Sequence, residues 1–286
     1  MNRNRLVPYT FILPYLVIFG LFWAWPIVYS VYLSFLDTRG FPWALEWGVN
    51  WGRILKDPFF IQALKNTLLL LLIQVPIMLV LATGLAVALN SPLLKLKGFY
   101  RFAFFAPVVV GSVAYSAVFR LLFNTQNGAV NAALTGIGLP RIDWLNDPLP
   151  AFILIVLTVT WRWTGYNAII ILAGLQNIAL ELYEASKIDG ASPWQQFWRI
   201  TLPLLRPILV FSLVLSVIGT LQLFTEPLLI TGGGPGNATL TLGVYLYQQG
   251  FRSFNFGYAS AIGYAIAAFA VLFSALQLRI FGGEPS

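Results

Sequence analysis

Six long apolar stretches are the feature of this sequence that most constrains its fold. An α-helix needs about 20 predominantly apolar residues to cross the hydrocarbon core of a bilayer. The stretches cover residues 11–36, 66–90, 102–123, 150–174, 204–225 and 254–278, and turn-forming residues separate them. The sequence therefore predicts an all-α integral membrane protein with six transmembrane helices.

The composition agrees with a chain that is surrounded by membrane lipid. Only 9% of the 286 residues are charged, whereas a soluble domain carries about a quarter. Cysteine and histidine are absent, which excludes disulfides and thiolate metal sites and removes the commonest metal ligand. The net charge of +7 does not indicate a nucleic-acid partner, because the basic residues stand singly at the ends of apolar stretches.

The basic residues also indicate which way the helices point. Arg3 and Arg5 precede a first apolar stretch that is too long for a cleaved signal peptide, so we expect an uncleaved anchor. With the N-terminus inside, segments 1–10, 91–101, 176–206 and 279–286 hold nine basic residues, and the outer segments hold six. Lys and Arg favour the cytoplasmic side. We therefore expect both termini and the 176–206 loop to be cytoplasmic.

The loop between the fourth and fifth stretches, residues 181–207, predicts two short helices with a sharp joint. Gly190 can adopt the left-handed conformation that ends a helix. Ser192 suits an N-cap that forms a capping box with Gln195, and Pro193 suits the first helical position. Two further prolines, Pro203 and Pro207, predict a break or kink before the fifth stretch. We expect this loop to expose the apolar residues Ile188, Trp194, Phe197 and Trp198.

Nine positions of this loop follow a spaced pattern: Glu184, Ala185, Asp189, Gly190, Ala191, Phe197, Ile200, Leu202 and Pro203. The pattern resembles the EAA loop of permease subunits of binding-protein-dependent ABC importers, with Ser186 where that family commonly has a second Ala. The resemblance implies the type I ABC importer permease fold. It also implies a coupling helix that docks into a cleft on a separate cytoplasmic ATPase. The alternative is an interfacial amphipathic loop without a partner.

Further motifs resemble carbohydrate importers of the maltose-transporter type. They are Leu13-Pro14, Pro26, Asn66-Thr67 and the turn Gly232-Gly233-Gly234-Pro235. The alternative for the last motif is an ordinary turn at the outer membrane surface. The resemblance covers nearly the whole chain. It implies a transmembrane domain over 64–280 after an N-terminal tip and first helix at 1–36. It also implies a multi-pass location in a prokaryotic inner membrane and a di- or oligosaccharide as the solute.

The same resemblance implies a set of partners. They are a second homologous permease, two copies of an ABC ATPase and an extracytoplasmic solute-binding protein, all in a lipid bilayer. The Gly-rich turn is not a phosphate loop, because a P-loop needs a Lys-Ser or Lys-Thr pair and the chain has none. We therefore expect no cofactor on this chain, no catalytic residue and no metal, with ATP and Mg bound by the partner ATPase.

Two helical faces are candidates for a solute pathway, because polar groups inside a bilayer tend to face a bundle interior or water. The two faces belong to the fourth and fifth apolar stretches. In maltose-type systems, which the chain resembles, the solute site is built largely from the corresponding two helices. Aromatic rings together with hydroxyl and amide groups suit a sugar. Small and hydroxylated residues also serve as contacts between membrane helices, so packing is the alternative for each of them. The candidates are Trp161, Arg162, Trp163, Tyr166, Asn167, Ser216, Gly219, Thr220 and Leu223.

Arg162 leaves the solute class open. An arginine inside the membrane needs an acidic partner, water or an anionic ligand, so we weigh a structural ion pair against a phosphorylated solute such as a glycerophosphate ester. Glu226, the one acidic residue near a span, is expected to be interfacial. A secondary transporter or channel is the rival class, and amino-acid, peptide or phosphate import remain open. A membrane-embedded hydrolase would need clustered metal ligands or a nucleophile–base pair, and the sequence shows neither.

Overall fold

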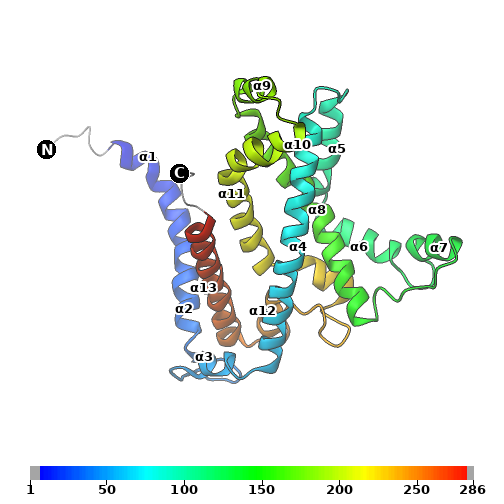
Figure 1. Ribbon diagram of the computed structural model, residues 1–286. Coiled ribbons are helices and arrows are strands. Elements are labelled where there is room, and N and C mark those ends of the chain that lie inside the picture. The colour runs from blue at the N-terminus through cyan, green and yellow to red at the C-terminus, as the bar shows by residue number, and fades with distance from the viewer. Residues whose placement is uncertain (1–6, 282–286) are drawn as a thin grey trace. The chain divides into compact units, whose positions relative to one another are not determined.

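The computed structural model describes residues 7–281, so Arg3 and Arg5 lie outside the described residues. Helices dominate the described chain, and they fall into two compact units. Of the described residues, unit 1 comprises 7–61 and 245–265, and unit 2 comprises 62–244 and 266–281. Figure 1 labels the α-helices of both units.

Unit 1 begins with one continuous apolar helix made of α1 (Val7–Phe19), a π-helical turn η2 (Gly20–Ala24) and α2 (Trp25–Leu33). The N–H of Trp25 bonds to the carbonyl of Gly20, five residues back, immediately before Pro26. Proline cannot donate a hydrogen bond, and a widened turn at this position accommodates the missing N–H. The span 11–33 buries none of its most apolar window against the rest of the chain.

A short, tightly bonded segment follows this span in unit 1. Strands β1 (Leu36–Asp37) and β2 (Ala44–Leu45) pair antiparallel, with Leu36 opposite Leu45, and α3 (Val49–Ile54) follows. The amide of Asn50 donates to the carbonyls of Ser34 and Leu36 at 3.1 and 2.8 Å. The segment is therefore fixed to the end of α2.

Buried Asp57 connects this segment to α12 (Leu242–Tyr247) and α13 (Phe256–Phe281), whose portions 245–247 and 256–265 belong to unit 1. The hydroxyls of Tyr245 and Tyr258 donate to its Oδ2 at 2.5 and 2.6 Å. Burial by itself raises the pKa of Asp57, but these two bonds and two backbone N–H groups hold the pKa below its ordinary value. A further π turn, η5 (Gln248–Arg252), lies between the two helices.

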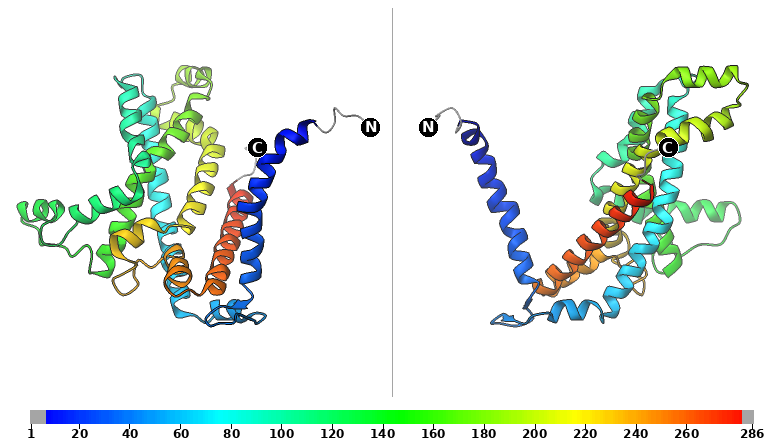
Figure 2. Two further views of the ribbon diagram at one scale, coloured as in Figure 1. Left: turned by 180° about the vertical axis from the view of Figure 1, so that it is seen from behind. Right: turned by 60° about the vertical axis from the view of Figure 1, so that its left-hand side comes forward.

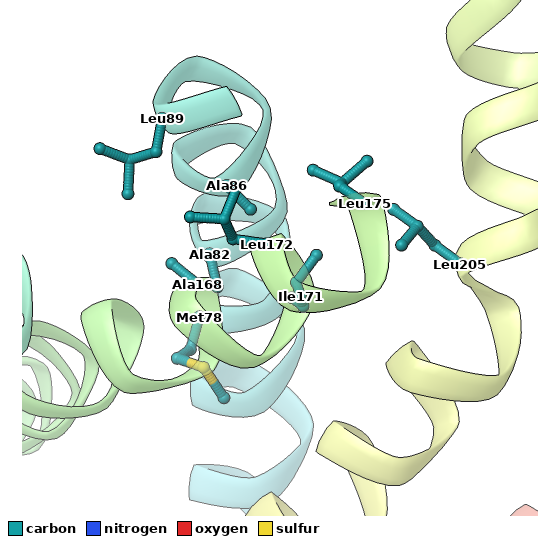
Figure 3. Close-up of a cluster of buried hydrophobic side chains, with 9 residues drawn as sticks. All are labelled: Met78, Ala82, Ala86, Leu89, Ala168, Ile171, Leu172, Leu175 and Leu205. Atoms are coloured by element: carbon teal, nitrogen blue, oxygen red, sulfur yellow. The ribbon is translucent and has the colours of Figure 1, made fainter. Parts of the chain in front are cut away.

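Unit 2 is built around α8 (Pro148–Gln176), which contacts both α5 (Lys97–Val109) and α11 (Leu202–Leu221). Helix α4 (Pro58–Asn90), which begins in unit 1, also packs against the helices of unit 2. Figure 3 shows the buried cluster that joins three of these helices: Met78, Ala82, Ala86 and Leu89 of α4, Ala168, Ile171, Leu172 and Leu175 of α8, and Leu205 of α11. The alanines are fully buried, as expected where membrane helices approach closely.

One glycine marks the closest approach between α5 and α8. A Cβ built on Gly165 would overlap the backbone carbonyl of Phe104. Only a residue without a side chain fits at this crossing. Gly165 therefore sets the distance between the two helices.

The predicted third span over 102–123 is not one straight helix. The structure has two helices there, α5 and α6 (Ser112–Leu122), bent by 95° (Figures 1 and 2). Val110 and Gly111 are both extended, with ψ of 131° and 135°, and they turn the chain. At about 1.5 Å rise per residue neither helix alone reaches across a core of about 30 Å.

Among the described residues, five helices are long and apolar enough to cross a membrane, and the bent pair makes six if it counts as one span. The remaining elements are α7 (Ala129–Gly136), α9 (Leu180–Ile188), α10 (Pro193–Gln196), and the π turns η3 (Phe197–Thr201) and η4 (Pro227–Thr231). Of the break or kink expected at Pro203 and Pro207, the break does not occur. Residues 193–221 form one helix that contains a π-helical turn, η3, just before Pro203. The π-helical turn η2 stands in the same position relative to Pro26.

Candidate functional site

A small cavity lies among α4, α8 and α11 of unit 2, with a volume of about 70 Å³. The structure brings together at this cavity seven of the nine residues that the sequence predicts for a solute pathway. Its lining consists of Gln74, Met78, Val159, Trp163, Tyr166, Asn167, Leu215, Ser216, Gly219, Thr220 and Leu223. All of these side chains are uncharged, so the cavity offers aromatic faces, amides and hydroxyls.

The aromatic part of the lining is fixed by contacts within α8. Trp163 and Tyr166 meet edge to face with ring centroids 5.6 Å apart. The amide of Asn167 donates to the carbonyl of Trp163 at 3.0 Å, which leaves its side-chain oxygen as an acceptor. On the opposite wall, Ser216 donates back to the carbonyl of Ser212 at 2.7 Å, as hydroxyls in membrane helices commonly do.

Sequence reasoning missed the contribution of α4. Gln74 is 2% exposed and lines the cavity although the second span was not considered for the pathway. A single amide within an otherwise apolar run was a usable signal, because polar groups at membrane depth face an interior. Met78 carried no such signal.

Trp161 and Arg162 lie outside the cavity, although both were predicted for the pathway. Successive helix residues are rotated by about 100°, so neighbours of Trp163 point elsewhere. The ring of Trp161 lies 5.2 Å from that of Phe119 and 6.0 Å from that of Tyr115, and it is 44% exposed.

Arg162, which is partly buried, forms an ion pair with buried Glu226 of the same chain. Its Nη1 lies 3.1 Å from Oε1 of Glu226 and donates to the Tyr115 hydroxyl at 2.5 Å, while that hydroxyl donates to the same carboxylate. Glu226, which the sequence predicts at the membrane interface, is 2% exposed and is enclosed by the chain itself. Of the two readings of Arg162, this geometry matches the structural ion pair.

The loop 181–207 forms the stiff joint that its sequence predicts. Helix α9 ends at Ile188, and Gly190 follows with φ of +78°. The N–H of Ala191 bonds to the carbonyl of Ser186, and that of Gly190 to the carbonyl of Lys187, which is the Schellman pattern. Ser192 caps α10 with a complete capping box to Gln195. The two local predictions, a glycine C-cap and a capping box, are confirmed.

Side chains tie the two arms of this joint together. The Tyr183 hydroxyl lies 2.9 Å from that of Thr201, and the Gln196 amide donates to the Ser186 hydroxyl at 2.9 Å. Ser186 is the position that departs from the EAA pattern, and it serves here as a link between the arms. We call α9, α10 and η3 with the residues that connect them (180–201) the elbow.

The elbow presents an apolar surface. Ile188 is 88% exposed and Trp194 69%, and Trp194 forms an edge-to-face contact with Trp198 at 5.5 Å. Phe197, expected on the same exposed face, is half-buried. Glu184, Ala185, Asp189, Gly190 and Pro203 of the nine-position pattern are exposed, and Ala191, Phe197, Ile200 and Leu202 are partly covered. The elbow therefore exposes Ile188, Trp194 and Trp198, three of the four apolar residues that the sequence predicts to be exposed.

The elbow and the Gly-rich turn lie at opposite ends of unit 2 (Figure 1). A cavity among apolar helices of membrane-spanning length, two of which lead to the elbow, matches the architecture of a multi-pass membrane transport protein. The chain belongs to the family of binding-protein-dependent transport system inner membrane components, whose sequence model matches residues 67–281. It is therefore a permease subunit of a binding-protein-dependent ABC importer.

Individual relatives agree with this family. The chain is 43% identical over 272 residues to the lactose transport system permease protein LacF of Rhizobium radiobacter, covering 93% of this chain and 91% of LacF. It is 36% identical over 288 residues to the arabinooligosaccharides transport system permease protein AraP of Bacillus subtilis, covering 98% and 90%. A solved bacterial ABC transporter involved in import of the acidic polysaccharide alginate shares the fold, with a TM-score of 0.86 at 23% identity, covering 99% of this chain and 98% of that one.

Proposed function

We propose that the solute carried by this permease is a di- or oligosaccharide and that it passes through the cavity among α4, α8 and α11. The observation that carries the proposal is the lining itself, in which two aromatic rings stand beside amides and hydroxyls. Aromatic faces pack against sugar C–H groups, and a few polar groups fix the orientation of a bound ligand. The names of the relatives above, which refer to lactose and arabinooligosaccharides, support the same class.

The charges of unit 2 argue against a phosphorylated glycerol derivative. The lining residues are uncharged, and Arg162 already pairs with Glu226. A buried anionic ligand would need an unpaired cation to compensate for its lost hydration. The same ion pair argues against a proton- or sodium-coupled transporter, because the carboxylate of Glu226 is occupied.

The size of the cavity supports a pathway shared with a second homologous permease. One water molecule needs about 10–15 Å³ on this scale, so about 70 Å³ holds a few waters and no disaccharide. The site must enlarge during transport, and a partner subunit would supply its other half. This chain then alternates access and binds no cofactor itself.

The elbow would receive the driving force from a separate ATPase that holds ATP and Mg, present in two copies. Its ties between Tyr183 and Thr201 and between Ser186 and Gln196 support this role, because a rigid body transmits displacement without bending. Helices α8 and α11, which flank the elbow, also line the cavity. A displacement of the elbow would therefore move two walls of the pathway.

We place the elbow and both termini on the cytoplasmic side of a prokaryotic inner membrane. The excess of basic residues in those segments supports this orientation. The opposite face, with the Gly-rich turn, would receive an extracytoplasmic solute-binding protein.

Uptake by the reconstituted transporter tests the solute class. Trp163→Ala and Tyr166→Ala are expected to change the KM or the selectivity among lactose, arabinooligosaccharides and other sugars, while assembly persists. Trp161→Ala, which removes an aromatic ring outside the cavity, is the matched control and should leave the selectivity unchanged. Loss of assembly without any change in selectivity would mean that the two rings only pack helices together.

A further inference from the structure

The buried ion pair occupies a place where the helical backbone is interrupted. The regular hydrogen bonding of α11 ends at Leu221, and residues 222–224 form no helix before the chain coils again at Thr225. Glu226 follows directly and is held by Arg162 of α8 and Tyr115 of α6. The chain directly after the irregular segment is thus fastened to two other elements of unit 2.

The same ion pair contacts one wall of the cavity and is joined through the chain to the other. On α8, the guanidinium carbon of Arg162 lies 5.2 Å from the ring centroid of Trp163, a cavity residue. A cation over an indole face is attracted by the ring quadrupole. On the other wall, Leu223 lines the cavity and lies three residues before Glu226. The ion pair is therefore one of the contacts that connect the aromatic wall to the segment after α11.

We propose that the Arg162–Glu226 ion pair, supported by the Tyr115 hydroxyl, is a latch that holds the irregular segment against α8 and so sets the closed form of the cavity. This inference rests on the proposed function of the cavity as a solute pathway. Arg162 and Glu226 act as positioning residues: neither lines the cavity, and both act through Trp163 and Leu223.

The chemistry predicts different results for single and paired substitutions. Removing one partner leaves a buried charge uncompensated, which disturbs the fold as well as the latch. Removing both charges leaves no such penalty, and only the latch is lost. Glutamine matches the shape of glutamate and is shorter than arginine, so Arg162→Gln with Glu226→Gln removes both charges and separates the two groups.

The absence of cysteine from the sequence makes a direct test possible. Ser216→Cys places one thiol in the cavity lining with a small change in size, and we call it the cavity thiol. Leu93→Cys, at a position 89% exposed, supplies the control thiol. Both are introduced into the complete transporter in nanodiscs, and the rate of reaction with a charged, water-soluble thiol reagent is measured on this chain.

In the double glutamine variant the cavity thiol is expected to react about 10- to 100-fold faster than in the unmodified background, the factor that loss of a charge-assisted hydrogen bond produces in a conformational equilibrium. The rate at the control thiol should stay constant. Arg162→Lys, which keeps the charge, should stay nearer the original rate. An unchanged rate at the cavity thiol in the assembled double variant would overturn the latch.

A second arm separates the latch from the choice of solute. Labelling needs no transported molecule, so it reports on the latch even if the solute is not a sugar. Protection of the cavity thiol by the transported sugar tests the pathway instead. Faster labelling without sugar protection would support the latch and contradict the proposed solute site.

Discussion

The left-handed glycine of the elbow allows a sharp test of how the elbow works. Gly190 has φ of +78°, and a Cβ added there would meet no atom within 4 Å. A substitution at this position therefore changes the backbone preference without a clash. A left-handed residue with a side chain costs about 1–2 kcal/mol, and β-branched residues are the least tolerant. Asparagine adopts this conformation more readily than other non-glycine residues.

We expect Gly190→Val to reduce coupled transport by about 5- to 30-fold, the ratio that 1–2 kcal/mol sets between two conformations. Gly190→Asn should stay much closer to the original, although both substitutions add bulk. The assay is uptake per ATP hydrolysed by the reconstituted transporter with its solute-binding protein. Gly98→Ala, in α5 and also free of neighbours within 4 Å, is the control because its φ is not left-handed.

Two outcomes would refute this reasoning about Gly190. Normal uptake in Gly190→Val would mean that the bend of the elbow is not needed for coupling. Equal losses in the Val and Asn variants would mean that side-chain bulk, rather than backbone conformation, disturbs the surface.

Three further predictions concern other parts of the chain. Gly165→Ala should lower the yield of assembled protein, measured by size-exclusion chromatography, because its Cβ meets the carbonyl of Phe104. Ser186→Ala should remove the bond from Gln196 and increase amide hydrogen exchange in the elbow while exchange in α4 stays constant. Asp57→Asn should lower the free energy of unfolding at neutral pH by about 1–3 kcal/mol, because the charged acceptor of the hydrogen bonds from two tyrosine hydroxyls is lost. Folding lowers the pKa of Asp57, so the wild type should be more stable than Asp57→Asn above about pH 4. This difference in stability should disappear as the pH falls through the lowered pKa. Thermal unfolding of both proteins across acidic pH measures it.

Local chemistry explains why the elbow could be predicted closely. A glycine C-cap and the Ser192–Gln195 capping box depend on residues within one turn, so the sequence contains all the partners. The two faces of α8 and α11 could also be predicted, because helical spacing alone places Tyr166 and Thr220 with their neighbours on those faces.

Contacts between distant residues explain the failures. Hydropathy does not distinguish a straight span from the bent pair α5–α6, since both sides of Gly111 are equally apolar. The partner of Arg162 lies 64 residues away along the chain, and its identity requires the packed structure. The need for glycine at position 165 likewise arises from another helix.

The proposed coupling role of the elbow requires that it contact an ATPase. A photo-crosslinking amino acid in place of Trp194, which is 69% exposed on the elbow, tests it in native membranes. The same probe in place of Phe41, 96% exposed in the segment after the first span, is the control. We predict that the Trp194 probe captures an ATPase subunit in a yield that changes with bound nucleotide, and that the Phe41 probe does not. Capture of lipid alone at Trp194, or of an extracytoplasmic protein, would contradict the claim.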